Sequence, residues 1–289
     1  MTRRPIIFAA AALALALVAA GCGDDETTTD SASGGADTSS CAKADLALKE
    51  SGKLTVATGE PAFEPWVVDD DPTNGKGYEA AVVDAVAAEL GLAKGDVTWT
   101  RTGFDEAVAP GTKDFDFNVQ QYSITVDRKK VVDFSDGYYT VEQAIIGRAD
   151  GPFSGAKTLT DLEDARLGAA IGTTSLDYID EFIKPTTQPL AFDDNAAAKA
   201  AFDADQVDAI VFDLPTAYYI TAVEIEGSSI IGVLPQQGPA EELGFLFEKD
   251  SKLVDCVNQA LGKVKTSGKL DELDKEWLNQ GGDIPTLEK

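Results

Sequence analysis

The alternation of short buried strands with helices is the feature that most constrains what this chain can fold into. It begins near Leu46 and continues to the C-terminal helices. The stretch Tyr78–Leu90 is typical of the helices, because its alanine, valine and leucine side chains recur at helical spacing and Gly91 ends it. Other expected elements are strands at Phe115–Val119, Val207–Phe212 and Leu243–Phe247 and a helix at Thr174–Ile183. Repeated strand–helix units predict an α/β fold with largely parallel sheets flanked by helices.

The strand–helix units fall into two sets, separated by a Gly-, Pro- and Ser-rich loop at 150–157. We expect a first lobe formed by residues 46–144 and 240–289, and a second lobe, residues 145–239, inserted into it. Two connections between lobes create a hinge and a cleft. Ligands of open α/β sheets bind beyond the carboxyl ends of the strands, and often between domains.

The N-terminal segment has the pattern of a secretory signal peptide. Arg3 and Arg4 precede an apolar run from Ile6 to Ala20, which is shorter than the about 20 residues of a membrane-spanning helix. The following Ala-Ala-Gly-Cys22 resembles a bacterial lipobox, which predicts removal of residues 1–21 and lipidation of Cys22. An ordinary signal peptide with an incidental cysteine is the alternative. Residues 22–45 are then the lipidated cysteine and a disordered tether, since 23–40 hold no large apolar side chain.

Charge and residue types exclude several classes of function. The chain holds 24 Lys and Arg, 50 Asp and Glu, and no His, for a formal charge of −26. Nucleic acid is therefore an unfavourable partner, and histidine-based metal sites or catalytic triads are excluded. The three cysteines form no CxxC pair, which argues against a thiolate metal site or a redox centre. We expect neither a metal nor a cofactor.

A series of motifs carries a specific likeness. They include SGKLTVAT at 51–58, GKGYEAAVVDAVAAELG at 75–91, SITVDRKKVVDFSDGYY at 123–139, GAAIGTTSLDYI at 168–179 and VDAIVFDLPTAYY at 207–219. In this order and spacing the chain resembles the family 3 extracellular solute-binding proteins of ABC transporters. The resemblance implies a two-lobe periplasmic-binding-protein fold of type II with a ligand cleft between the lobes. It also implies an amino-acid ligand and ABC permease subunits as partners. We expect a monomer that is not an enzyme, located outside the cytoplasm and lipid-anchored to the outer face of the bacterial cell membrane.

The family pattern assigns partners to the ligand carboxylate. Arg128 and Ser123 match its S-x-T-x-x-R motif, and a guanidinium fork can bind both carboxylate oxygens. A surface arginine paired with a nearby aspartate is the alternative. The turn Gly172-Thr173-Thr174 precedes a helix, whose N-terminal N–H groups attract anions. Plain capping of that helix by threonine is the alternative.

The family pattern also assigns residues to the ammonium group and the side chain of the ligand. Asp213 ends a strand and corresponds to the carboxylate that receives the ligand ammonium, with capping of the next helix as the alternative. Phe63 and Phe104 correspond to positions that enclose the ligand side chain. Glu60 corresponds to an acidic position that contacts this side chain in basic-amino-acid binders. Gln121, with Gln120 beside it, ends a strand and could bond polar ligand groups or be solvated.

Two questions remain open at this level. Cys41 and Cys256 flank the segments of the first lobe, and secretion favours a disulfide between them over free thiols. The function also has alternatives. A cyclohexadienyl-dehydratase-like enzyme would use Glu60 or Glu142 as its acid, and a ligand sensor would need a separate signalling partner. The acidity of the chain favours a neutral or basic amino acid as ligand.

Overall fold

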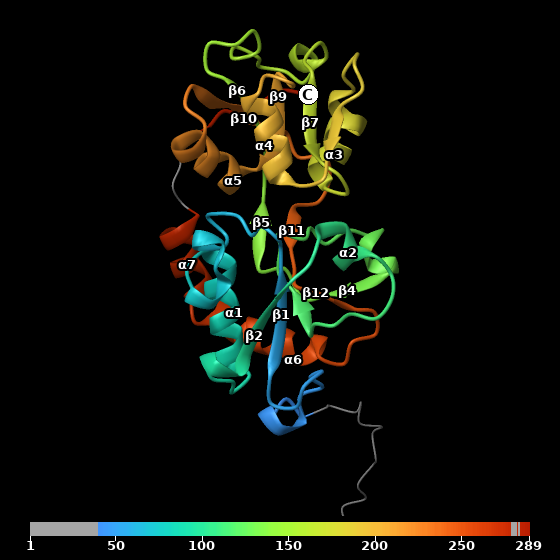
Figure 1. Cartoon of the computed structure of the whole chain (residues 1–289), viewed down its shortest axis with the longest axis vertical. Helices are drawn as coiled ribbons and strands as arrows, with labels where there is room; N and C mark the ends of the chain where they lie inside the picture. The colour runs from blue at the N-terminus through green and yellow to red at the C-terminus, as the bar shows by residue number, and fades with distance from the viewer. Residues whose placement is uncertain (1–39, 279–281, 283) are drawn as a thin grey trace, which may run out of the picture. The chain divides into compact units, whose positions relative to one another are not determined.

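The computed structural model describes residues 40–278, 282 and 284–289. The predicted signal peptide, Cys22 and most of the predicted tether lie outside the described residues. Two five-stranded sheets with their helices form two lobes, joined by a two-stranded ribbon (Figure 1). The strands are β1 (Leu54–Thr58), β2 (Val97–Arg101), β3 (Phe117–Asn118), β4 (Val132–Phe134), β5 (Tyr139–Val141), β6 (Gln143–Arg148), β7 (Leu167–Ala170), β8 (Leu190–Phe192), β9 (Ala209–Asp213), β10 (Ser228–Val233), β11 (Glu241–Leu243) and β12 (Leu246–Glu248). The α-helices are α1 (Tyr78–Glu89), α2 (Phe104–Val108), α3 (Thr174–Tyr178), α4 (Asn195–Asp203), α5 (Leu214–Tyr219), α6 (Val254–Thr266) and α7 (Lys269–Trp277).

The first lobe is built on the sheet β2-β1-β3-β12-β4. Strand β1 runs parallel to β2 and β3, whereas β12 runs antiparallel to β3 and β4. Helix α1 packs against α6 and α7. Helix α6 shows why the sequence folds this way, because its stripe of Cys256, Val257, Ala260, Leu261 and Val264 is buried in the same core as α1.

The second lobe is built on the sheet β10-β6-β9-β7-β8. Strand β9 is its central element, and its side chains alternate between two hydrophobic clusters. Ala209 and Val211 belong to one cluster, while Ile210 and Phe212 belong to the other. Burial on both faces explains why this strand is a continuous apolar run. The run ends at Asp213, which the sheet therefore carries at its carboxyl end.

Half of the ladders in each sheet are antiparallel, so the expectation of largely parallel sheets is wrong. Strands β6 and β12 are responsible, because each enters its sheet directly from the ribbon between the lobes. The single strand expected at Leu243–Phe247 is likewise two strands. Gly244 separates them, and a Cβ at this position would lie 2.8 Å from the Ile124 side chain.

The ribbon between the lobes consists of β5 and β11, which pair antiparallel (Figure 1). A second link joins the lobes where the buried Trp66 Nε1 donates to Thr216 Oγ1 at 2.8 Å. The structure corrects the expected boundaries in two places. Residues 143 and 144 already belong to β6 of the second sheet. Residues 284–289 also return to the second lobe, because Leu287 is buried in its core and bonds the backbone of Val233.

A disulfide joins Cys41 to Cys256, with a Cα–Cα distance of 5.3 Å. It ties the segment before β1 to helix α6 across a sequence separation of 215 residues. In the part of the chain that the structure describes, no helix has the length and apolar character needed to cross a membrane.

Candidate functional site

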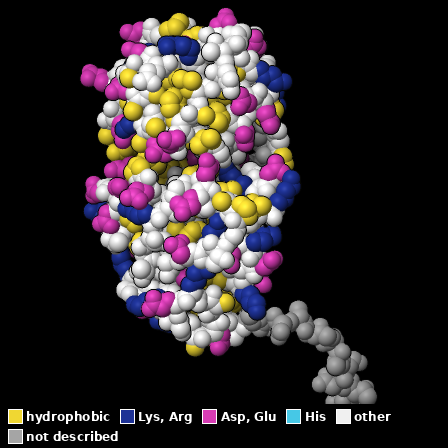
Figure 2. All heavy atoms as spheres, turned by 45° about the vertical axis from the view of Figure 1, so that its right-hand side comes forward, with side chains coloured by type: hydrophobic (Ala, Val, Ile, Leu, Met, Phe, Trp, Pro, Cys, Tyr) yellow, Lys and Arg dark blue, Asp and Glu magenta, His cyan; other side chains and the backbone are white. Residues whose placement is uncertain are grey.

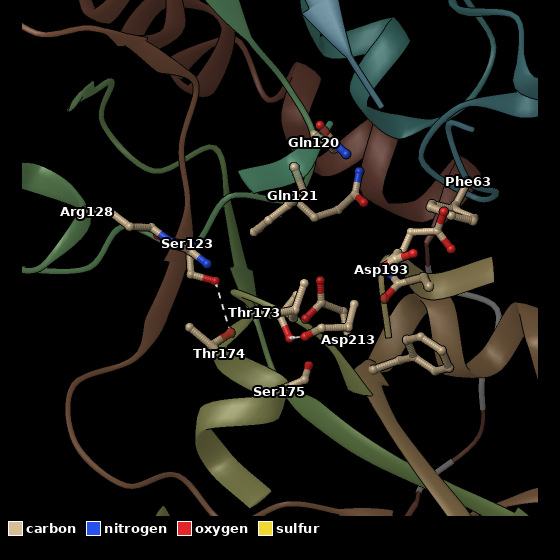
Figure 3. Close-up of a pocket in the computed structure, with 16 residues that line it drawn as sticks. Phe63, Gln120, Gln121, Ser123, Arg128, Thr173, Thr174, Ser175, Asp193 and Asp213 are labelled. Atoms are coloured by element: carbon tan, nitrogen blue, oxygen red, sulfur yellow. Dashed lines mark hydrogen bonds between the residues drawn. The ribbon is translucent and has the colours of Figure 1, made fainter. Parts of the chain in front are cut away.

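A cavity of about 60 Å³ lies between the lobes and collects most of the predicted ligand-binding residues (Figure 3). Phe63, Phe104, Gln121, Ser123 and Arg128 line it from the first lobe, and Thr173, Thr174 and Asp213 line it from the second. Glu60 and Gly172 are the members of the predicted set that do not line it. Among the described residues of this lining, Arg128 is the only cation.

Arg128 is a buried cation held by backbone carbonyls. It is 8% exposed, and its Nη1 and Nη2 donate to Ser123 O at 2.7 Å and to Gly172 O at 2.9 Å. The guanidinium also lies 5.3 Å from the centre of the Phe104 ring. Burial lowers the pKa of Arg128, although nearby acids oppose this shift. The alternative of a surface ion pair is wrong, because Arg128 is buried and the nearby Asp127 pairs with Lys130 instead.

Asp213 is the acidic counterpart of Arg128 on the opposite lobe. Its Oδ1 accepts a hydrogen bond from Gln143 Nε2 at 2.7 Å. The side chain makes no capping bond to helix α5, so the capping alternative is wrong. Burial and the adjacent charge of Glu241 raise the pKa of Asp213 to about 8. A cation placed beside this carboxyl would favour its ionised form.

The turn before α3 has both a capping and a cavity-lining role. Thr173 Oγ1 accepts from Leu176 N at 3.2 Å and donates to Ala170 O at 2.7 Å, so Thr173 is the N-cap. Thr174 Oγ1 lies 3.3 Å from Ser123 Oγ and joins the two lobes (Figure 3). Gly172 has a φ of +71°, and a Cβ there would lie 2.1 Å from Asp105 Oδ1. The left-handed backbone therefore favours glycine at this turn, and a larger residue would also have to displace the Asp105 side chain.

Comparison with known proteins decides the family. Residues 54–280 match the model of the bacterial extracellular solute-binding proteins, family 3. The chain belongs to this family. The arginine-binding extracellular protein ArtP of Bacillus subtilis is 28% identical over 79% of this chain and 88% of its own length. The L-cystine-binding protein TcyA of the same organism is 28% identical over 92% of this chain and 93% of its own length. The solved structure of the ancestral amino-acid-binding protein AncCDT-1, a precursor of cyclohexadienyl dehydratase, has a TM-score of 0.64 and 31% identity, covering 79% of this chain and 96% of AncCDT-1.

The remaining predicted residues of this solute-binding protein divide into two groups. Phe63 lines the cavity, and Phe104 stacks on Tyr122 with ring centres 4.5 Å apart while also contacting Arg128. Glu60 is exposed and outside the cavity. The expected contact of Glu60 with a ligand side chain therefore has no support from this geometry.

Sequence reasoning missed the acid that holds Gln121. Glu79 of α1 is fully buried, and its carboxylate accepts from Gln121 N at 2.8 Å, from Gln121 Nε2 and from Tyr138 Oη. These bonds fix Gln121 in a left-handed backbone conformation with a φ of +51°. Burial raises the pKa of Glu79 to about 7, and the hydrogen bonds from Gln121 and Tyr138 act against this shift. Glu79 thus positions a cavity-lining amide without itself lining the cavity.

Other missed residues line the cavity from the second lobe. Asp193, Asp194 and Asn195 lie at the start of α4, where Asp194 caps the helix by accepting from Ala197 N at 2.7 Å. The Asp-Asp-Asn run before an alanine-rich helix was a visible capping signal, although it did not indicate the cavity. Ser175 of α3 is a further missed residue of the lining, whereas Gln120, expected beside Gln121, lines the cavity from the first lobe.

Proposed function

We propose that this chain is the solute-binding subunit of an ABC importer and that it binds an amino acid, with neutral or basic side chains favoured. One observation carries the proposal. Arg128 from the first lobe and Asp213 from the second lobe line a single cavity between the lobes. An amino acid carries a carboxylate and an ammonium on one carbon, so it needs both charge partners when it is enclosed.

The balance of charge in the cavity supports the expected class of side chain. Asp193, Asp194 and Asp213 face one cation, Arg128. An acidic amino acid would bring a second carboxylate into this lining, whereas a basic side chain would find aspartates available. The names of the relatives are consistent with this preference, because ArtP is named for arginine and TcyA for cystine. L-Arginine and L-cystine are therefore the first ligands to test.

Binding in this site would couple to lobe closure. The carboxylate partner and the ammonium partner lie on different lobes, so one ligand contacts both only when the lobes approach. A ligand that bonds both lobes stabilises the closed arrangement by its differential affinity. The β5–β11 ribbon and the Trp66–Thr216 contact connect the lobes, which makes this region the expected hinge.

A thermal-shift screen of the twenty amino acids with ornithine, citrulline and cystine tests the proposal. A ligand that binds only the folded state raises the free energy of unfolding. At a ligand concentration of 100 times Kd the gain should be about 2.7 kcal/mol, which gives a clear rise in Tm. A screen in which no compound raises Tm would refute the proposal.

Lipidation at Cys22 remains part of the proposal, and metabolic labelling with a palmitate analogue should mark wild type and not Cys22→Ala.

A dehydratase is the competing function, since AncCDT-1 is a precursor of such an enzyme. The two acids suggested for it, Glu60 and Glu142, are both exposed and do not line the cavity. We therefore expect no turnover. An ultraviolet assay for phenylpyruvate formed from prephenate checks this, and catalytic turnover would overturn the assignment as a binding protein.

A further inference from the structure

Glu241 is a carboxylate placed at the junction of the two lobes. It is the first residue of β11, on the ribbon between the lobes. Its Oε1 accepts from Ser123 Oγ of the first lobe at 2.5 Å and from Thr174 Oγ1 of the second lobe at 2.7 Å. Both hydroxyls line the cavity. The family pattern assigns these two residues to the ligand carboxylate, yet an internal carboxylate already bonds both.

The hydroxyl protons limit what Ser123 and Thr174 can do next. Each hydroxyl has one proton and two lone pairs. When both protons are donated to Glu241, the two hydroxyls present only lone pairs to the cavity. They can then accept from an N–H group but cannot donate to a second carboxylate. A ligand carboxylate must displace Glu241 to use these donors.

The charges around Glu241 act in the same direction. Gln143 Nε2 donates to Asp213 Oδ1 at 2.7 Å and lies 3.5 Å from Glu241 Oε1, so one amide connects two acids. Arg128 is the only cation among the described residues that line this cavity, and it interacts electrostatically with both Glu241 and Asp213. A ligand carboxylate entering here would meet Glu241 as a like charge, whereas an ammonium would meet two carboxylates.

We propose that Glu241 is an internal competitor for the ligand carboxylate, and that it lowers the preference of this protein for amino acids over the corresponding amines. The inference rests on the proposed function, because it specifies how the same cavity selects its ligand. Glu241 is thus a specificity-determining residue that acts by occupying hydroxyl donors from both lobes and by its negative charge.

Two variants test the proposal. Glu241→Gln keeps the shape and an acceptor oxygen but removes the charge, while Glu241→Ala removes both charge and acceptor. Isothermal titration calorimetry should measure Kd for L-arginine and for agmatine, which is arginine without its carboxylate. L-Cystine and cystamine form the second pair. We expect the ratio Kd(amine)/Kd(amino acid) to rise at least tenfold in Glu241→Gln, equivalent to about 1.4 kcal/mol, and at least as much in Glu241→Ala.

Glu242→Gln is the matched control. Glu242 is the next residue of β11, is exposed, and does not line the cavity. The substitution removes the same charge from the same strand, so the ratio should stay within twofold of wild type. An equal rise in the ratio for Glu242→Gln would show that total charge, and not the position of Glu241, sets the preference.

Several results would overturn the proposal. A ratio that is unchanged or reduced in both Glu241 variants would do so, as would parallel weakening of both ligands, which indicates a purely structural role. Wild type alone also provides a test that needs no variant to fold. Because Glu241 offsets part of the affinity that the carboxylate gains from Arg128, the wild-type ratio should be below about 100.

The same measurements separate this inference from the proposed function. If wild type binds no amino acid, the proposed function fails. In that case the competition proposal still requires Glu241→Gln to gain binding of L-arginine or L-cystine. A variant that folds by circular dichroism and gains no such binding overturns the inference as well.

Discussion

Replacing Arg128 by alanine is the most direct perturbation of the cavity. The substitution removes the one cation among the described residues that line it and leaves Asp213, Asp193 and Asp194 facing the ligand. A ligand carboxylate would then lose its guanidinium partner in a largely desolvated place, since Arg128 is only 8% exposed. We expect weaker amino-acid binding with a much smaller effect on an amine lacking the carboxylate.

The magnitude follows from the burial and bonding of this side chain. Removing one partner of a buried, hydrogen-bonded charge pair costs about 2–5 kcal/mol. Two guanidinium N–H groups are already committed to Ser123 O and Gly172 O, which leaves fewer for the ligand. We therefore expect the lower part of this range, about 2–3 kcal/mol, or roughly 30- to 150-fold in Kd. Arg128→Lys keeps the charge but loses the fork, so it should restore part of the affinity.

Arg148→Ala supplies a closely matched control. Arg148 also stacks on a phenylalanine, with its guanidinium carbon 4.6 Å from the Phe202 ring centre, and also donates to two backbone carbonyls. It lies outside the cavity, so its removal should leave Kd unchanged while lowering Tm. Isothermal titration calorimetry of both variants with the ligand found in the screen gives the comparison. A change below tenfold for Arg128→Ala, or an equal change for Arg148→Ala, would refute the reasoning.

Three further predictions concern buried acids and the disulfide. Asp213→Asn should weaken binding of an ammonium-bearing ligand. The affinity of wild type should rise with pH toward about 8 as the Asp213 carboxyl ionises, and calorimetry should find no such pH dependence in the variant. Burial raises the pKa of Glu79 from 4.5 to about 7, so between these pH values the folded protein binds more protons than the unfolded chain. The free energy of unfolding should therefore fall by on the order of 3 kcal/mol as pH rises from 4.5 to 7. Denaturant titrations across this range should show a flatter pH profile for Glu79→Gln. Cys41→Ser breaks the bond to Cys256 and should lower the free energy of unfolding by about 2–5 kcal/mol, whereas equal stability of wild type with and without reductant would contradict this.

The family resemblance, carried by short motifs, predicted which residues should lie at the centre of the candidate site. The apolar run of β9 predicts a buried strand, and its last residue, Asp213, must then emerge at the carboxyl edge of the sheet. Arg128 and Ser123 lie five residues apart in one motif, and the fold brings both to the cavity. Their position beside one cavity could be predicted because each lies in a motif of the family pattern, while their contacts with a ligand stay predictions.

The residues that connect the site could not be predicted in this way. The bond between Glu79 and Gln121 spans 42 residues, that between Gln143 and Asp213 spans 70, and that between Ser123 and Glu241 spans 118. A glutamate in the first turn of α1 has no local signature of its partner. Glu60 shows the converse case, since this position matched by resemblance is exposed and outside the cavity.

The bonds of Glu241 also couple its role to the movement of the lobes. It lies on β11, one of the two strands that connect the lobes, while its hydroxyl partners Ser123 and Thr174 belong to different lobes. A bend of the β5–β11 ribbon that separates the lobes must therefore lengthen at least one of these two bonds. The proton of the freed hydroxyl would then be available for a hydrogen bond to an entering carboxylate. The open arrangement would thus bind amino acids with less competition than the closed one, so we expect Glu241 to make closure around an amino acid less favourable than closure around an amine.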